Sequence, residues 1–141
     1  MKLNKNSNCP CGSNRLYKDC CKIYHKGIVP KTSLELMKAR FSAYVIGDAE
    51  FIMRTTHPQN EQFRTSPKQW RSEILYFSKT THLEELKILK FEEDEHNGFV
   101  EFNLIFIQDN VASRLHEKSY FVKSNEQWLY IKGEFVFSQL S

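Results

Sequence analysis

The sequence predicts an α+β protein in which a small cysteine-rich segment precedes three helices and a curved antiparallel sheet. Three observations predict this order. All four cysteines lie within residues 9–21, apolar residues recur at helical spacing between residues 34 and 77, and long extended segments follow from residue 82. The chain has 141 residues, of which 40% are hydrophobic and 26% charged. This length and composition fit one compact domain with one small appendage, and they exclude a disordered or fibrous chain.

Charge divides the chain near residue 31. Residues 1–31 carry seven Lys or Arg side chains and one acidic side chain, whereas residues 32–141 carry 13 Lys or Arg and 16 acidic side chains. The N-terminal segment is therefore basic and the remainder slightly acidic. The sequence begins with polar residues and contains no run of about 18 apolar residues that would span a bilayer. We expect a cytoplasmic protein without a membrane span.

The cysteines are spaced to form one metal site: Cys9, Cys11, Cys20 and Cys21. In a reducing cytosol, clustered thiols are expected to be metal ligands rather than disulfides. The first pair lies two residues apart in an extended segment, and a short helix over residues 14–19, capped by Ser13, would return the second pair to the first. Four thiolates complete one tetrahedral zinc shell and leave no position for water. We therefore predict one structural zinc ion per chain.

The same stretch resembles the SEC-C motif, a short zinc-binding element at the C-terminus of the SecA translocation ATPase and in many other bacterial proteins. The sequence Cys-Pro-Cys-Gly-Ser at 9–13, Tyr17 and the pair at 20–21 fall where that motif has them. SEC-C elements are associated with protein contacts, and here the cluster lies in the basic segment. The resemblance and the charge together predict a partner-binding surface: Arg15, Tyr17, Lys18 and Lys22.

Helices are expected in the segment that follows the cysteines. Apolar residues recur at helical spacing over residues 34–45, with Ser33 as the expected N-cap. Asp48 can cap a second, short helix over about residues 49–54. Ser66, followed by a proline at the first helical position, opens a third predicted helix over about residues 67–77. These helices precede every predicted strand.

Four extended segments follow, over roughly residues 83–95, 98–108, 112–123 and 127–137. Their connections are short and rich in turn residues, which favours antiparallel hairpins. Apolar residues alternate in the second segment from Val100 to Phe106, so that one face of the sheet should cover the core. The acidic run at residues 92–95 is expected to be a solvated hairpin end, because consecutive strand carboxylates alternate between faces.

Residues 36–44, 56–58, 97–100 and 128–133 are similar to the bacterial YchJ family. The resemblance implies a SEC-C motif joined to a nuclear transport factor 2-like (NTF2-like) cone, in which a long sheet wraps around the first helix. It places the motif at residues 1–28 and the cone at residues 32–141, and we expect the two parts to fold independently. Some members carry a second, C-terminal SEC-C motif. This sequence ends at Ser141 without one, so a role that needs two knuckles is not expected.

Cones of this superfold have an open end, and four residues are candidates for its pocket: Arg40, Tyr44, His57 and Glu117. The first two lie one turn apart on the predicted first helix, and strand alternation directs the carboxyl group inward. We expect the guanidinium to bind a carboxylate or carbonyl groups of the sheet, since an unpaired buried charge is costly. The alternatives are purely structural: a surface ion pair for Arg40, and a capping or surface position for His57.

Two functions remain open at this point. The first is a non-enzymatic adaptor, in which the basic zinc knuckle binds a protein or ribonucleoprotein partner. The alternative is a small-molecule binder or an enzyme similar to isomerases and dehydratases, which would use the cone pocket. Catalysis is the less expected reading, because no Asp–His dyad, phosphate-binding loop or hydrolase motif is present in the sequence. Two chains are also expected to be able to pair through the sheet.

Overall fold

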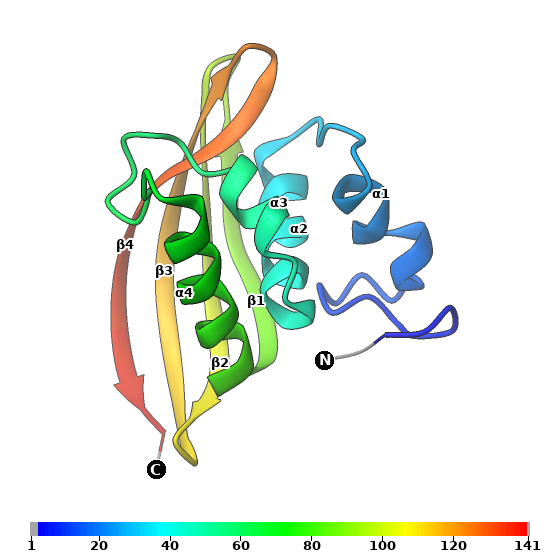
Figure 1. Ribbon diagram of the computed structural model, residues 1–141, viewed down its shortest axis with the longest axis vertical. Helices are drawn as coiled ribbons and strands as arrows, with labels where there is room; N and C mark the ends of the chain where they lie inside the picture. Colours follow the sequence, from blue (N-terminus) through cyan, green and yellow to red (C-terminus); the bar gives the residue numbers. More distant parts are fainter. Residues whose placement is uncertain (1–2, 141) are drawn as a thin grey trace.

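A computed structural model describes residues 3–140, and its fold class is the one predicted (Figure 1). A 3₁₀ helix and four α-helices precede four β-strands. The helical elements are η1 (Tyr17–Asp19), α1 (Cys21–His25), α2 (Ser33–Ile46), α3 (Ala49–Arg54) and α4 (Pro67–Thr80). The strands are β1 (Thr81–Glu93), β2 (Asn97–Gln108), β3 (Val111–Ser124) and β4 (Gln127–Gln139). No helix within residues 3–140 has both the length and the apolar character needed to cross a membrane.

Side-chain caps define where the three larger helices begin. The side chains of Asp48 and Ser66 accept hydrogen bonds from the first turns of α3 and α4, as the sequence predicts. The expected N-cap of α2 was wrong by one residue. Thr32 is the cap and accepts from Glu35 N–H, whereas Ser33 is the first helical residue. Helix α2 ends at Gly47, whose φ of 80° is a left-handed conformation that glycine adopts without strain.

The sheet is an antiparallel meander in the order β1-β2-β3-β4. Two-residue turns at 109–110 and 125–126 have positive φ at both positions, as tight hairpins require. The register places Glu117 of β3 directly opposite Phe102 of β2 and Phe135 of β4. Because directly paired residues share a face, this carboxyl group lies on the same face as the buried aromatic ring of β2. Strand alternation therefore fixes its inward position.

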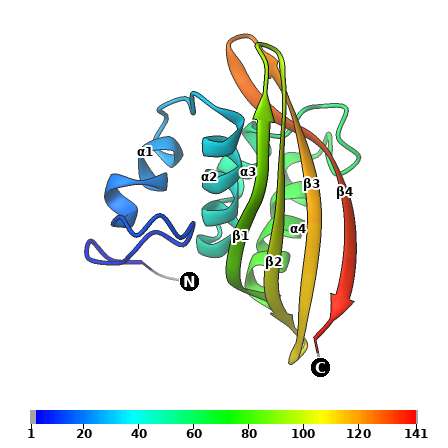
Figure 2. The same ribbon diagram turned by 180° about the vertical axis from the view of Figure 1, so that it is seen from behind.

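Helices α2 and α4 cover the concave face of the sheet, and the cysteine-rich segment packs on the outer side of α2 (Figures 1 and 2). Buried residues of α2, α3 and β2 form one core with all four cysteines. We define residues 3–28 as the knuckle and residues 32–140 as the cone. This core continues across the boundary between the two parts, because the cysteine cluster is itself one wall of the interior.

Local structure in the knuckle differs from the sequence-based expectation. The helix expected over residues 14–19 is reduced to the three residues of η1, since Asn14 has a positive φ and Leu16 is extended. A second short helix, α1, begins at Cys21 and was not predicted. The backbone pairs instead as a small loop, in which Cys9 N–H donates to Arg15 C=O at 2.8 Å. This loop returns the second cysteine pair to the first.

The acidic run at the end of β1 is more than a solvated hairpin end. Glu93 Oε1 accepts hydrogen bonds from the backbone N–H and the hydroxyl of Ser33, both at 2.8 Å. A carboxylate at the first turn of α2 satisfies a free helical N–H and interacts favourably with the helix dipole. Asp94 accepts from two backbone N–H groups of its own turn. Glu93 thus connects strand β1 of the sheet to the start of helix α2.

Candidate metal centre and candidate binding cavity

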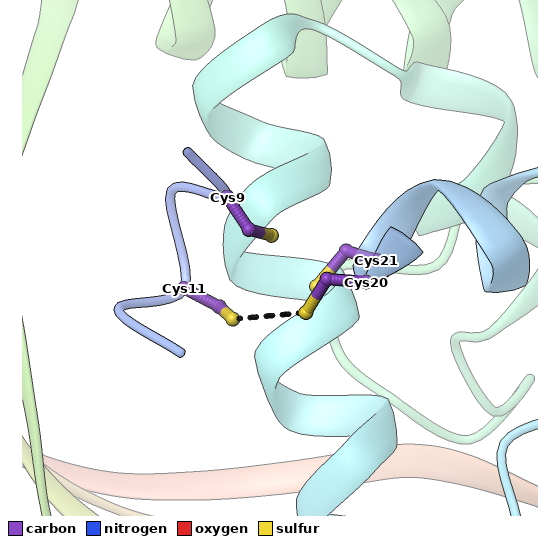
Figure 3. A group of neighbouring side chains, drawn as sticks. All are labelled: Cys9, Cys11, Cys20 and Cys21. Carbon is purple, nitrogen blue, oxygen red and sulfur yellow. Dashed lines mark hydrogen bonds between the residues drawn. The ribbon is translucent and has the colours of Figure 1, made fainter. Parts of the chain in front are cut away.

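The side chains of Cys9, Cys11, Cys20 and Cys21 point toward one another (Figure 3). Their four sulfur atoms lie within 4.8 Å of one another, and all four residues are buried. Two cysteines come from the N-terminal loop, and two from the junction of η1 with α1. The closest hydrogen-bonded pair, Cys11 Sγ and Cys20 Sγ, is 3.6 Å apart.

This arrangement fits a tetrahedral metal ion. Metal–sulfur bonds of about 2.3 Å would separate sulfurs by about 3.8 Å. The charges of the cluster also favour a cation. The neighbouring thiols of Cys11 and Cys9, and then burial, raise the pKa of Cys21 above its ordinary value of 9.0. Four buried thiols therefore cannot all ionise without a compensating positive charge, and the cluster is a metal-binding site by geometry and donor chemistry.

Polar groups around the cluster support the sulfur atoms. The Ser13 hydroxyl lies 3.2 Å from Cys20 Sγ, and Arg15 Nη2 lies 3.6 Å from the same sulfur. On the opposite side, Cys9 Sγ is 3.5 Å from the Ser42 hydroxyl of α2. Such outer contacts orient metal ligands and offset their negative charge. Arg15 therefore has a local role at the metal centre, while Lys18 and Lys22 are exposed beside it.

The side chain of Tyr17 is half-buried, and its hydroxyl binds within the knuckle. Its hydroxyl lies 2.7 Å from His25 Nδ1, and His25 Nε2 lies 2.8 Å from Ala39 C=O of α2. Because a carbonyl only accepts, Nε2 carries the proton and Nδ1 accepts from the phenol. Burial raises the pKa of Tyr17 to about 12 and lowers that of His25 below its ordinary 6.5. This chain of hydrogen bonds joins the knuckle to α2.

The cone encloses a cavity of about 920 Å³ between the sheet, α2 and α4. Its wall is mainly apolar and is formed by side chains of β2, β3 and β4 with the inner faces of the two helices. Phe135 and Phe137 are among the lining residues and are 51% and 59% exposed, so this part of the wall reaches solvent. The lining includes three of the four expected residues: Arg40, Tyr44 and Glu117.

Glu117 is the centre of a polar group on the cavity wall. Its Oε2 accepts a hydrogen bond from Tyr130 Oη at 3.2 Å and a shorter one from the Ser119 hydroxyl. Burial raises the pKa of Glu117 above its ordinary 4.5. Gly133 makes this meeting sterically feasible, since a Cβ there would lie 2.6 Å from both the Glu117 carboxylate and the Tyr130 hydroxyl.

Arg40 is 7% exposed and lines the same cavity, but its hydrogen-bond partners differ from those expected. Its Nη1 donates to Ile52 C=O at 3.2 Å and to the Thr55 and Thr56 hydroxyls at 2.8 and 3.0 Å. These acceptors belong to α3 and its C-terminal turn, and none of them comes from the sheet. The sheet contributes the Tyr130 ring, whose centroid is 4.7 Å from Arg40 Cζ.

His57 is not among the residues that line the cavity, so its expected place at the mouth needs correction. Its backbone N–H donates to Tyr130 C=O at 2.8 Å, and its Nδ1 accepts from Gln59 N–H at 3.0 Å. The segment after α3 is held to β4 by this pairing and turns the imidazole into its own loop. His57 therefore caps a turn of its own loop, in agreement with the structural alternative to a pocket role.

Family models match both parts of the chain. Residues 32–133 match the model described as "YchJ, middle NTF2-like domain", and residues 6–22 match the SEC-C motif. The chain belongs to the YchJ family. Among its relatives, a UPF0225 protein of Vibrio parahaemolyticus is 39% identical, and the match covers 92% of this chain and 75% of the relative. A UPF0225 protein of Sodalis glossinidius is 35% identical, with coverage of 92% and 84%.

A solved structure agrees with this YchJ-family assignment. The solution structure of a SEC-C motif containing protein from Rhodopseudomonas palustris superposes with a TM-score of 0.79 at 28% identity, over 92% of this chain and 99% of that chain. The similarity therefore extends over the knuckle and the cone together. Both predictions of family and fold class are confirmed.

Sequence reasoning missed three residues of this YchJ-family protein that the fold brings into use. His25 joins the knuckle to α2, and Ser119 and Tyr130 bind the Glu117 carboxylate. Ser119 lies two positions after Glu117 and therefore on the same face of β3, but a serine at that position does not by itself indicate a function. Tyr130 could not be placed, because a register shift between Tyr120 and Phe121 changes which β4 residues face inward.

Proposed function

We propose that this protein binds a small, mainly apolar molecule in the cone, and that a zinc ion in the knuckle braces the helix that carries the binding residues. The observation that supports this proposal best is the convergence of Arg40, Glu117 and Tyr130 on one apolar cavity. An enclosed apolar space with a few oriented polar groups is the usual form of a small-molecule site. The cytoplasm, where thiols stay reduced, is the proposed compartment.

Binding is favoured over catalysis by the polar groups present. Acid–base chemistry needs two groups of different acidity that both reach the substrate. Glu117 is one candidate, but its Oε2 already accepts from two hydroxyl groups. His57, the imidazole among the four pocket candidates, binds within its own loop. We therefore assign the cavity a binding function and assign no reaction to it.

Zinc is the metal that we propose for the cysteine cluster, with one ion per chain. Four thiolates in a closed shell are typical of structural zinc sites. Cys9 and His25 connect this cluster to Ser42 and Ala39 on the outer side of α2, while Arg40 lies on the cavity side of the same helix. Elemental analysis after expression in metal-controlled medium tests the assignment. Iron in place of zinc, or two ions per chain, would overturn it.

The cavity proposal is tested by screening small molecules against the zinc-loaded protein with ligand-observed NMR. Ser113 lines the cavity, so Ser113→Trp should fill part of it and abolish binding of the hits. Arg114→Trp is the matched control, because the neighbouring β3 residue points to the opposite face and is exposed. Hits that persist in Ser113→Trp, or a screen without hits, would refute the cavity as the site.

An adaptor function is the second candidate, supported by the exposed surface of the knuckle. Lys18, Lys22 and Lys26 are exposed beside Ile23 and Ile28, which are 41% and 61% exposed. A mixed basic and apolar surface suits an acidic protein or ribonucleoprotein. The double variant Lys18→Glu and Lys22→Glu should weaken capture of such a partner while the metal is retained.

Arg15 is left unchanged in that adaptor test, because its guanidinium contacts the sulfur of Cys20. Its replacement would change the metal site and the surface charge at once. The captured partner should also dissociate as the salt concentration rises, since exposed charge pairs are screened. Unchanged capture by the double variant would show that the knuckle surface is not the one used.

A further inference from the structure

Arg40 is a buried cation that forms no ion pair with any described residue, although Glu117 lines the same cavity. Its side chain lies among α2, α3 and β4, and the residue is only 7% exposed. Within residues 3–140, no carboxylate lies close enough to form an ion pair with it. All three of its hydrogen bonds to described residues leave from Nη1 and end on neutral oxygens. Buried charges are normally paired, so this guanidinium is suited to bind an anionic ligand.

The remaining donors of Arg40 open toward the cavity. Nη2 and Nε donate to no described residue. Every fully buried side-chain nitrogen or oxygen in the described part of the chain does have a partner. These two nitrogens must therefore be accessible, and the accessible space that Arg40 lines is the cavity. Nε–H and Nη2–H together form the edge of the guanidinium that binds carboxylates in a bidentate manner.

We propose that the ligand class of the cone is an apolar carboxylic acid, whose carboxylate binds the Nε–Nη2 edge of Arg40 and whose apolar body packs against the inner face of the sheet. This inference rests on the proposed function and specifies its ligand. The apolar body would meet the side chains of Phe102, Leu104 and Phe121, which are buried and line the cavity. Burying that body supplies affinity, while the single cation supplies selectivity for the head group.

The number of charges favours a monoanion over a phosphate. Arg40 is the only Lys or Arg among the described lining residues that lies in the interior, since Arg64 at the edge is exposed and pairs with Glu73 at 3.7 Å. A dianionic phosphate would leave one negative charge uncompensated in an apolar space that also contains Glu117. A carboxylate is matched by one guanidinium.

The protonation state of Glu117 would decide whether this group opposes or assists the binding of a carboxylate ligand. The titratable and charged groups that face it are Arg40 and Tyr44 from α2 and Tyr130 from β4. Burial raises the pKa of this carboxyl group, so it takes up a proton more readily than an exposed glutamate does. A bound carboxylate nearby would favour the neutral form further. Affinity should therefore increase as the pH falls through the raised pKa of Glu117, as long as the ligand itself stays ionised.

Cinnamate and cinnamamide test the proposal on the unmodified, zinc-loaded protein by isothermal titration calorimetry. The two molecules share an apolar body and differ in the charge of the head group. Cinnamate should bind about tenfold or more tightly, because a charge-assisted bidentate contact contributes more than a neutral hydrogen bond. The Arg40 Nε–H resonance should shift with cinnamate and not with cinnamamide, a change that a merely structural arginine would not show.

Arg40→Gln should remove the preference for cinnamate over cinnamamide, with folding checked by circular dichroism. The comparison in the unmodified protein stands even if that variant does not fold. Equal affinity for both molecules would overturn the ligand class and leave small-molecule binding intact. Binding of neither molecule, while other screen hits bind and are lost in Ser113→Trp, would likewise overturn only the ligand class. A screen without any cavity-dependent hit would remove the proposed function itself.

Discussion

The knuckle and the cone bury polar chemistry in opposite ways. In the knuckle, four sulfur donors converge within 4.8 Å and are enclosed by groups that already serve them, such as Ser13 and Ser42. In the cone, Arg40 and Glu117 line a cavity of about 920 Å³, and part of the guanidinium has no partner among the described residues. A closed donor shell is suited to stability, whereas open donors are suited to a ligand.

The two regions meet on one helix, α2. One side of α2 receives the knuckle through Ala39 and Ser42, and the other carries Arg40 and Tyr44 into the cavity. Elements that position a binding site are most effective when they are rigid. We therefore propose that the metal site stabilises the cavity through the packing of α2.

The largest effect is expected from loss of a metal ligand. Cys20→Ser should release the metal and disorder the knuckle, and because the cysteines share the core of α2, the unfolding temperature of the whole protein should fall by about 5–15 °C. Calorimetry with metal analysis measures both changes. Ser13→Ala is the matched control, since it removes a neighbour of Cys20 Sγ and keeps all four ligands. An unchanged main transition in Cys20→Ser would mean that the two regions are independent.

A smaller loss is expected when the knuckle keeps its metal but loses its contact with α2. The His25 side chain is 3% exposed and bridges Tyr17 to Ala39. His25→Ala should therefore cost about 2–4 kcal/mol in unfolding free energy, from a cavity and two lost hydrogen bonds, with metal content unchanged. His116→Ala serves as the control, because that side chain is 44% exposed on the sheet. Equal stability of the two variants would contradict the bracing role.

Gly133→Ala should affect the cone and leave the knuckle unchanged. The new methyl group would lie 2.6 Å from both the Glu117 carboxylate and the Tyr130 hydroxyl, so both groups must shift and their arrangement on the cavity wall must change. Ligand affinity should fall by about tenfold, whereas stability should change by less than about 1 kcal/mol because the added methyl also restricts the unfolded chain. Titration of a cavity ligand and thermal unfolding separate the two effects. Unaltered affinity would place the ligand away from this carboxyl group.

The smallest effect concerns pH. Burial raises the pKa of Glu117 above 4.5, so the folded chain retains this proton at pH values where the unfolded chain has lost it. Stability from this group is full below about pH 4.5 and declines as the pH rises through the raised pKa. Glu117→Gln should remove that decline and be slightly more stable than the natural chain under alkaline conditions. Parallel pH profiles of unfolding for the two proteins would show that the carboxyl group titrates normally.

The metal site is the part that the sequence determined almost alone. Its four donors lie within 13 consecutive positions, residues 9–21, so local backbone geometry brings them together. Their spacing was therefore sufficient to predict the site. The caps Asp48 and Ser66, the strands and their turns were also legible, because each depends on residues close in sequence. Even here the prediction of a short helix over residues 14–19 was wrong. The positions of the ligands determine where the sulfur atoms lie, but they do not determine the backbone conformation between the ligands.

The cavity was decided by the tertiary structure. Arg40, Glu117 and Tyr130 come from α2, β3 and β4, and a register shift beside Phe121 determines that the tyrosine faces inward. The same packing turned Arg40 toward Ile52, Thr55 and Thr56, and pairing with β4 held His57 in its loop. Sequence periodicity reports which face of an element is buried, but not which distant element covers it. For this reason the residues of the cavity were partly foreseen, while their partners were not.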